Sequence, residues 1–352
     1  MTRAEQFEVI VIGGGQAGLA AGYHLAARGV QFVILEAGRR IGDSWRNRWE
    51  SLRLFTPARL DSLPGLPFPT DTNALPTKDA MADYLCSYAS QFNLPIRHEL
   101  RVDEVKMDAG RFQVSAGEQR FVADNVIVAT GGQPKRPSFA RELNAEIRHL
   151  HSFEYRSVEQ LKPGPTLVVG AGNSGAEIAI DSARAGHPTW LSGQKTGTAP
   201  PVLYSRPTWW LATRLLTTET AIGRRIAPRA LARGAPLVRL RERDLRAADV
   251  KRVPRMQGVA DGDPVLADGS RLQVDNVVWC TGFDWDLGHL RLLRIDPSDF
   301  AQNHRGVFSR VPGLYSVGRP FQVGIDSALI AGVGRDAEYV VDHIARQVSR
   351  RS

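Results

Sequence analysis

Residues 7–29 read FEVIVIGGGQAGLAAGYHLAARG, and this stretch decides the fold. A short apolar run passes into a glycine-rich turn, Gly13-x-Gly15-x-x-Gly18, and then into a helical pattern. The next apolar run ends at Glu36, 23 residues after Gly13. Strand, turn, helix, strand and acid in this register predict a βαβ unit that binds a dinucleotide. Gly13 permits the tight turn, Gly15 lets the backbone approach a pyrophosphate, and Gly18 lets helix and strand pack closely. Glu36 is expected to accept hydrogen bonds from the adenosine ribose.

The same pattern recurs at Gly170-x-Gly172-x-x-Gly175, with one difference. Residues 192–194, where the acid would stand, read Ser-Gly-Gln, and Lys195 follows. An acid there would repel a ribose 2′-phosphate, so its absence beside a lysine favours NADPH, with NADH as the alternative. No arginine stands there to bind the phosphate in a bidentate manner, and Lys195 could equally be a solvated loop residue.

A second repeat supports the first: DNVIVATG at residues 124–131 and DNVVWCTG at residues 275–282. Each stretch is predicted to be a buried strand that ends in a glycine turn. The chain is therefore predicted to be an α/β protein with two Rossmann-like dinucleotide-binding domains, the second inserted into the first. The expected boundaries are residues 1–155 and 283–352 for the first domain and 156–282 for the second.

Length and charge add two further expectations. The chain has 352 residues, enough for about two domains. Its net charge of +8 is concentrated between residues 206 and 255, which hold 13 Lys and Arg against 4 Asp and Glu. This basic stretch overlaps a predicted helical excursion at about residues 199–250. The excursion is either a solvated helical surface or a dock for an anionic lipid surface or an acidic carrier protein. No nucleic-acid-reading motif accompanies the charge, so nucleic acid is not an expected partner.

The two cysteines exclude several classes of protein. Cys86 and Cys280 are 194 residues apart, which offers no redox-active CxxC pair, no zinc cluster and no disulfide framework. No metal site is therefore expected. No apolar run approaches the roughly 18 residues needed to span a bilayer, and residues 1–6 contain no apolar signal region. The expected location is cytoplasmic.

Several motifs together resemble the flavin-containing monooxygenase family, single-component flavoproteins of class B, in its small bacterial form. They are GDSWR at residues 42–46, HSFEY at 151–155, GAGNSGAEIA at 170–179, the Thr-Gly pairs at 130–131 and 281–282, and the tail at 313–341. The resemblance covers nearly all of the chain except the helical excursion. It implies FAD in the larger domain, NADPH in the smaller, and oxygen delivered from a flavin C4a-(hydro)peroxide to a small organic substrate.

The resemblance also implies which residues form the site. Trp45, Phe55 and Gln322 are expected at the reacting centre. The expected cofactor-binding residues are Gly13, Gly15, Gln16, Gly18, Glu36, Trp45, Val102, Thr130, Gly131, Gly170, Gly172, Asn173, Ser174, Gly175, Lys195, Thr281, Gly282 and Gly318.

The chain departs from the family at two places. The family's active-site Asn is replaced, by spacing, with Phe55, so oxygenation is expected to be poorly coupled to NADPH use. Only the His151 to Tyr155 half of the linker signature is present, and its final Tyr makes Baeyer–Villiger chemistry less expected.

The sequence therefore predicts an FAD-dependent, NAD(P)H-oxidising monooxygenase acting with O₂ on a small molecule. Two alternatives stay open. One is a reductase that passes electrons to a quinone or a protein acceptor. The other is a flavin-binding sensor or docking protein, which the missing Asn and the basic excursion suggest.

Overall fold

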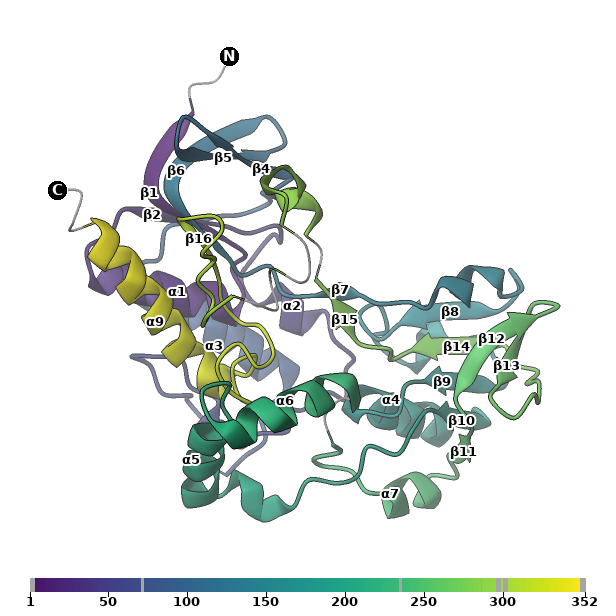
Figure 1. Cartoon of the computed structure of the whole chain (residues 1–352). Helices are drawn as coiled ribbons and strands as arrows, with labels where there is room; N and C mark the ends of the chain where they lie inside the picture. Colours follow the sequence, from purple (N-terminus) through teal and green to yellow (C-terminus); the bar gives the residue numbers. More distant parts are fainter. Residues whose placement is uncertain are drawn as a thin grey trace.

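The computed structural model describes residues 4–70, 73–233, 236–285, 287–295, 299 and 303–348 (Figure 1). Its strands form two large sheets, and helices pack against both. The predicted α/β class with two Rossmann-like units is confirmed.

The first sheet has the order β3-β2-β1-β6-β5-β4, and β16 also pairs with β6. The strands β3, β2, β1, β6 and β16 run parallel, whereas β4, β5 and β6 form an antiparallel meander. The bounds are β1 Glu5–Ile12, β2 Phe32–Leu35, β3 Ile96–Arg97, β4 Glu104–Asp108, β5 Arg111–Ala116, β6 Gln119–Val128 and β16 Leu314–Ser316.

Successive residues of β1 point to opposite faces of this sheet, as the strand period requires. Val9 and Val11 belong to one buried cluster, and Ile10 and Ile12 belong to another. Both faces of the strand are therefore covered, which explains its unbroken apolar sequence. The helices of this domain are α1 Gln16–Ala27, α2 Asp43–Arg46, α3 Lys78–Gln91 and α9 Ile330–Val348, and α1 packs against α9 (Figure 1).

The second sheet is parallel throughout, with the order β11-β10-β9-β14-β8. Its central strands β9 and β14 are buried along their whole length, as expected for a sheet covered on both faces. The bounds are β8 Arg148–His151, β9 Thr166–Val169, β10 Thr189–Ser192, β11 Lys251–Val253 and β14 Asn276–Trp279. Helix α4 covers Asn173–Arg184, and the hairpin consists of β12 Met256–Ala260 and β13 Asp263–Leu266.

The chain crosses between the two sheets twice, and the crossings pair with each other. Strand β7 (Gln133–Pro134) lies antiparallel to β15 (Phe283–Asp284), between the two domains (Figure 1). Strand β8 already belongs to the second sheet, whereas the sequence placed the boundary after residue 155. The division into domains stays a prediction, and strand membership puts the first crossing at β7.

The helical excursion at about residues 199–250 contains η4 (Pro201–Tyr204), α5 (Arg206–Leu215), α6 (Ala221–Arg233) and α7 (Glu242–Ala247). Several hydrogen bonds attach its first part to the first domain, and two of them are short. Arg59 Nη2 donates to the Tyr204 carbonyl at 2.6 Å, and the Thr218 backbone N–H donates to the Val323 carbonyl at 2.7 Å. Its later part contacts the second domain, where the Val238 backbone N–H donates to Asn173 Oδ1, so the segment lies against both domains.

Candidate functional site

The first glycine motif forms one wall of a cavity of about 420 Å³, named cavity I. A Cβ atom on Gly18 would lie 1.9 Å from the Gly13 carbonyl oxygen, so helix and strand can approach only because Gly18 has no side chain. A Cβ on Gly15 would meet nothing within 4 Å, because this position faces the cavity. The open space lies at the start of α1, where backbone N–H groups favour an anion. These residues fit the pyrophosphate of a dinucleotide.

Glu36 follows β2 and also lines cavity I. Its carboxylate accepts the backbone N–H groups of Gly14 at 2.5 Å and Gly38 at 2.6 Å. These bonds hold the acid against the glycine turn. Because a carboxylate has about four acceptor positions, it can also accept hydroxyl donors from a ribose.

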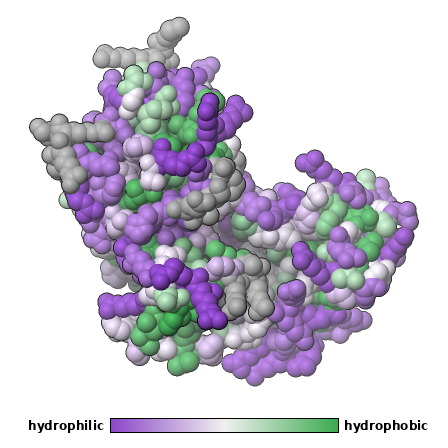
Figure 2. Space-filling view, viewed as in Figure 1, coloured by the Kyte–Doolittle hydropathy of each residue, from purple (hydrophilic) through white to green (hydrophobic). Residues whose placement is uncertain are grey.

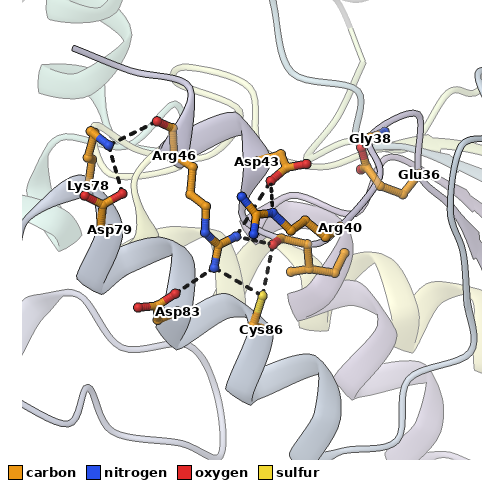
Figure 3. A network of polar contacts seen from close by, with 10 residues as sticks. Glu36, Gly38, Arg40, Asp43, Arg46, Lys78, Asp79, Asp83 and Cys86 are labelled. Carbon is orange, nitrogen blue, oxygen red and sulfur yellow. Dashed lines mark hydrogen bonds and ion pairs between the residues drawn. The ribbon is translucent and has the colours of Figure 1, made fainter. Parts of the chain in front are cut away.

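A polar network anchors the segment that follows Glu36 (Figure 3). Arg46 on α2 donates from Nη1 to the Ile41 carbonyl at 2.8 Å and from Nη2 to Asp83 of α3 at 2.6 Å. The Lys78 ammonium in turn donates to the Arg46 carbonyl at 3.1 Å. This network fixes α2 relative to α3 (Figure 3). Trp45 belongs to α2 and is therefore held with it.

A second cavity, named cavity II, has a volume of about 250 Å³ and opens beside the first. Its wall includes residues of both glycine-motif helices, Gln16 of α1 and Asn173 of α4. The two cavities share the lining residues Gln16, Trp45, Arg48, Phe283 and Ala328.

Hydrogen bonds fix this shared wall. Gln16 Nε2 donates to the Ala328 carbonyl at 3.1 Å, and Gln16 Oε1 accepts from Trp45 Nε1 at 3.2 Å. One amide thus ties the first glycine motif to the tryptophan and to the C-terminal loop. A ligand in cavity II therefore lies directly beside one in cavity I.

Arg48 carries a positive charge at the junction of the cavities. Its guanidinium carbon lies 5.1 Å from the ring centre of Phe153 and 5.3 Å from that of Phe283. Burial, and secondarily the charge of Arg156, lowers the pKa of Arg48 to about 10, so it stays charged at neutral pH. No carboxylate lies within ion-pair distance of it in the part of the chain that the structure describes. Arg48 is therefore available to an anionic group on a ligand.

Two buried carboxyl groups line cavity II. Burial raises the pKa of Asp61 to about 7, although a hydrogen bond from the Thr56 hydroxyl opposes this shift. Asp61 is 1% exposed, and its Oδ2 atom has no hydrogen-bond partner among the described residues. Burial also raises the pKa of Glu177 to about 7, with the nearby Arg239 opposing the shift. Below about pH 7 both carboxyl groups hold protons. Arg48 then supplies the charge on the part of the wall that cavity II shares with cavity I.

Glu177 also joins the two domains. It lies on α4, and its Oε2 accepts a hydrogen bond from Trp49 Nε1 of the first domain at 3.2 Å. The Glu50 backbone N–H donates to the Arg156 carbonyl at 2.8 Å beside it. Residues 49–61 therefore form the wall of cavity II while packed against the second domain.

The structure brings together many of the residues predicted from the sequence. Trp45 and Gln16 line both cavities, and Phe55 is half-buried in the wall of cavity II. The other predicted residues in cavity I are Gly13, Gly15, Glu36, Thr130, Gly131 and Gly318, and those in cavity II are Asn173 and Ser174.

Other predicted residues line neither cavity. Val102 packs on the apolar cluster beneath the first sheet. Gln322 is buried, with its amide near the Arg305 carbonyl. Lys195 is exposed on the loop after β10. Thr281 bonds to the Lys135 carbonyl, and Gly282 accepts from the Lys135 N–H, both at the crossing between domains. The roles assigned to these residues stay predictions.

The second motif repeats the packing of the first. A Cβ on Gly175 would lie 1.7 Å from the Gly170 carbonyl, whereas one on Gly172 would meet nothing within 4 Å. Asn173 accepts the Val238 N–H through Oδ1 at 2.9 Å and donates to the Pro236 carbonyl, so its amide also holds the returning chain. The two motifs therefore offer the same kind of open backbone position.

Sequence reasoning missed Arg48, Trp49, Asp61 and Glu177. Glu177 belongs to the GAGNSGAEIA stretch, but that motif gives no sign of its contact with Trp49. Arg48 meets Phe283 far along the chain, and Asp61 owes its raised pKa to burial. The signals in the sequence were that Arg48 and Trp49 stand close after the GDSWR stretch and that Glu177 stands within GAGNSGAEIA.

A family model described as pyridine nucleotide-disulphide oxidoreductase matches residues 10–318. The chain belongs to this family. The family name does not require a disulfide here, since Cys86 and Cys280 are both free thiols and no CxxC occurs in the sequence.

Two relatives in this family are informative. An uncharacterised CzcO-like oxidoreductase of Geobacillus kaustophilus is 37% identical over 96% of this chain and 98% of its own length. The rice protein (Oryza sativa subsp. japonica) named indole-3-pyruvate monooxygenase YUCCA1 is 34% identical over 59% of this chain and 53% of its own.

Among solved structures, a flavin-containing monooxygenase from Stenotrophomonas maltophilia superposes with a TM-score of 0.77 at 27% identity. The match covers 98% of this chain and 99% of that one. The predicted resemblance to flavin-containing monooxygenases is confirmed, and the protein is an FAD-dependent oxidoreductase of the monooxygenase type. No helix among the described residues has the length and apolar character that crossing a membrane requires.

Gly15→Val should remove flavin from the purified protein, because the new side chain would fill the open space at the start of α1. Gly172→Val is the matched control: its backbone is extended in the same way, and its side chain would enter the second motif. We expect Gly172→Val to stay yellow and to bind nicotinamide dinucleotide more weakly. Visible absorbance and a nucleotide titration measure both effects. Full flavin content in Gly15→Val would refute the assignment of FAD to cavity I.

Asp61 should make the free energy of unfolding depend on pH. Its pKa is raised from 3.8 to about 7 by folding, so the folded state binds the extra proton between these values. Stability is then lost as pH rises through this window, by about 1.4 kcal/mol for each pH unit, and the loss ends above about pH 7.

Asp61→Asn should remove this slope, which denaturant unfolding at several pH values can measure. Glu177 contributes equally to the pH dependence of unfolding in both proteins. The difference between their two slopes therefore isolates the contribution of Asp61. The exposed Asp108→Asn serves as the control and should keep the slope of the unmodified protein. If the free energy of unfolding changed with pH in the same way for Asp61→Asn and for the unmodified protein, Asp61 would be ionised in the folded state.

Proposed function

We propose that this protein is a monooxygenase that uses NADPH and transfers one atom of O₂ to a small organic substrate in cavity II. The observation that carries the proposal is the wall shared by the two cavities at Gln16, Trp45 and Arg48. The shared wall supports a substrate in cavity II that contacts the end of a cofactor in cavity I. Asn173 and Ser174 of the second motif also line cavity II.

In this proposal cavity I holds FAD, which when bound supplies hydride acceptance and the activation of O₂. The protein positions the cofactor and excludes water. Gly15 leaves space for the pyrophosphate, and Glu36 takes the ribose hydroxyls. Trp45, fixed by its bond to Gln16, packs where the two cavities meet.

The residues of cavity II suggest a class of substrate. The wall is mostly apolar, with Leu52, Leu54 and Phe55 among its members, and this favours a small molecule with an apolar body. A soft sulfur or nitrogen nucleophile is the proposed substrate. A 2-oxo acid is the second candidate, because the rice relative is named for indole-3-pyruvate and because Arg48 can bind a carboxylate.

We also propose NADPH over NADH, with a modest preference. Lys195 follows β10 and is exposed, so it offers a point charge and not a bidentate contact to a 2′-phosphate. Such an exposed pair is worth up to about 1 kcal/mol, which is a several-fold effect. Steady-state kinetics with both nucleotides, on the unmodified protein and on Lys195→Ala, test this. An unchanged ratio would place phosphate recognition elsewhere.

The function is tested by following NADPH, O₂ and product together. A monooxygenase consumes one NADPH, one H⁺ and one O₂ for each oxygenated product and water formed. A panel of thioethers, amines and 2-oxo acids under air provides the substrates. Product in proportion to O₂ supports the proposal. Turnover that requires an added quinone would identify a reductase instead, and negligible turnover with every acceptor would identify a sensor.

Phe55 should make the enzyme release H₂O₂. A phenyl ring packs and excludes water, but it cannot donate the hydrogen bond that an amide would supply near the reacting centre. One such bond is worth about 1 kcal/mol, so Phe55→Asn should reduce the peroxide released per NADPH by about fivefold. Phe55→Leu removes the ring without adding a hydrogen-bond donor, so it should not reduce the peroxide released per NADPH. Little peroxide from the unmodified protein would contradict the proposed role of Phe55.

A further inference from the structure

Large exposed apolar side chains gather on the helical segment between the two domains. Six of the nine such residues found among the described part of the chain lie between residues 202 and 231, each 41–61% exposed. We call these six the apolar patch: Val202, Trp210, Leu211, Leu215, Ile222 and Leu231. In Figure 2 hydrophobic atoms form a visible area over α5, next to strongly hydrophilic residues.

The apolar patch does not serve the protein's own core. None of its six members belongs to the three buried apolar clusters. The inner side of α5 is held in other ways: Thr213 is buried, and Trp209 stacks on Tyr204. Leaving six large apolar side chains in water is unfavourable, and such grouping on a surface indicates a binding partner.

Arginines surround the apolar patch without acidic partners. The Arg214 guanidinium lies over the Trp210 ring, 4.0 Å from its centre. Arg225 is exposed, and Arg224 donates only to backbone carbonyls in the bonds that the structure gives. No ion pair joins any of these three arginines to a carboxylate among the described residues. The partner must therefore offer both an apolar region for these side chains and negative charges for the arginines.

We propose that the apolar patch and its flanking arginines dock this protein on an anionic membrane surface. Trp210, Leu211 and Leu215 of α5 would enter the interface, with Trp210 at headgroup depth, while Arg214 and the exposed Arg225 contact lipid phosphates. No helix of the described chain could cross a membrane, so the contact is with the surface.

The charge distribution argues for lipid over a second copy of this chain. In a two-fold dimer the same patch would face itself. Helix α6 has the sequence AIGRRIAPRALAR, with four arginines and no acid, so such an interface would bring like charges together. An anionic lipid surface instead neutralises the arginines and accepts the apolar groups between them.

The position of the apolar patch connects it with the site. Arg59, which bonds to the Tyr204 carbonyl, lies in the segment that carries Phe55 and Asp61. Thr217 pairs with Gly324 in the loop before Ala328. Both segments line cavity II, so docking would bring the membrane close to that cavity.

The test uses the full-length flavoprotein and vesicles of two compositions, phosphatidylcholine alone and phosphatidylcholine mixed with phosphatidylglycerol. Flotation measures the bound fraction. We expect binding to the anionic vesicles and a large loss in high salt, because exposed charges are screened. Each arginine near the surface should contribute about fivefold to the partition coefficient.

Two variants locate the contact. Arg214→Gln with Arg225→Gln should weaken binding about 25-fold, since the two contributions multiply. Trp210→Ser with Leu211→Ser should abolish it. Arg101→Gln and Leu292→Ser, exposed residues outside the apolar patch, are the matched controls and should bind as the unmodified protein does. All variants should keep their flavin absorbance and thermal stability, which shows that they are folded.

Three results would overturn the proposal. The first is failure of the unmodified protein to bind anionic vesicles. The second is equal binding by the patch variants and the controls. The third is a dimer, seen by light scattering, that Trp210→Ser with Leu211→Ser dissociates while vesicle binding is absent, because the apolar patch would then be an interface between copies. Each of these results is independent of whether the proposed oxygenation is observed.

Discussion

The close approach of a helix to a strand at two glycines is the contact on which the rest of the structure depends. At Gly18 and at Gly175 a single methyl group would overlap a backbone carbonyl of the preceding turn. Without these contacts α1 and α4 could not begin where they do, and neither motif would expose its open backbone position. Both cavities have one of these helix starts in their walls, so both inherit this constraint.

The parts of the site that the sequence predicts are those made locally. Gly13, Gly15 and Glu36 act within one βαβ unit, and their spacing alone is enough to place them. Phe55 was placed by resemblance, and the structure puts it in the wall of cavity II. Lys195 was also placed by spacing, yet an exposed loop lysine gives no geometric sign of its partner. Local patterns predict backbone sites better than they predict charged contacts.

The remaining residues could not be predicted, because their properties come from contacts between distant segments. Asp61 is an ordinary aspartate in the sequence, and only burial changes its protonation. Glu177 meets Trp49 across 128 residues, and Arg48 meets Phe283 across an even longer interval. Periodicity and motif spacing carry no information on such pairs. These pairs depend on how the two domains are placed relative to each other, and no local sequence pattern predicts that placement.

The paired crossings β7 and β15 have a mechanical consequence. Two short antiparallel segments joined by a two-residue ladder are the only strand pairing that links the described parts of the two sheets. A narrow ribbon of this kind resists stretching but yields readily to torsion. Twisting it would move α4 relative to Trp49 and change the width of cavity II, whereas cavity I, whose wall lies mostly in the first domain, would change only near Phe283 and Asp284 of β15. The width of cavity II therefore depends more on the angle between the two sheets than the shape of cavity I does.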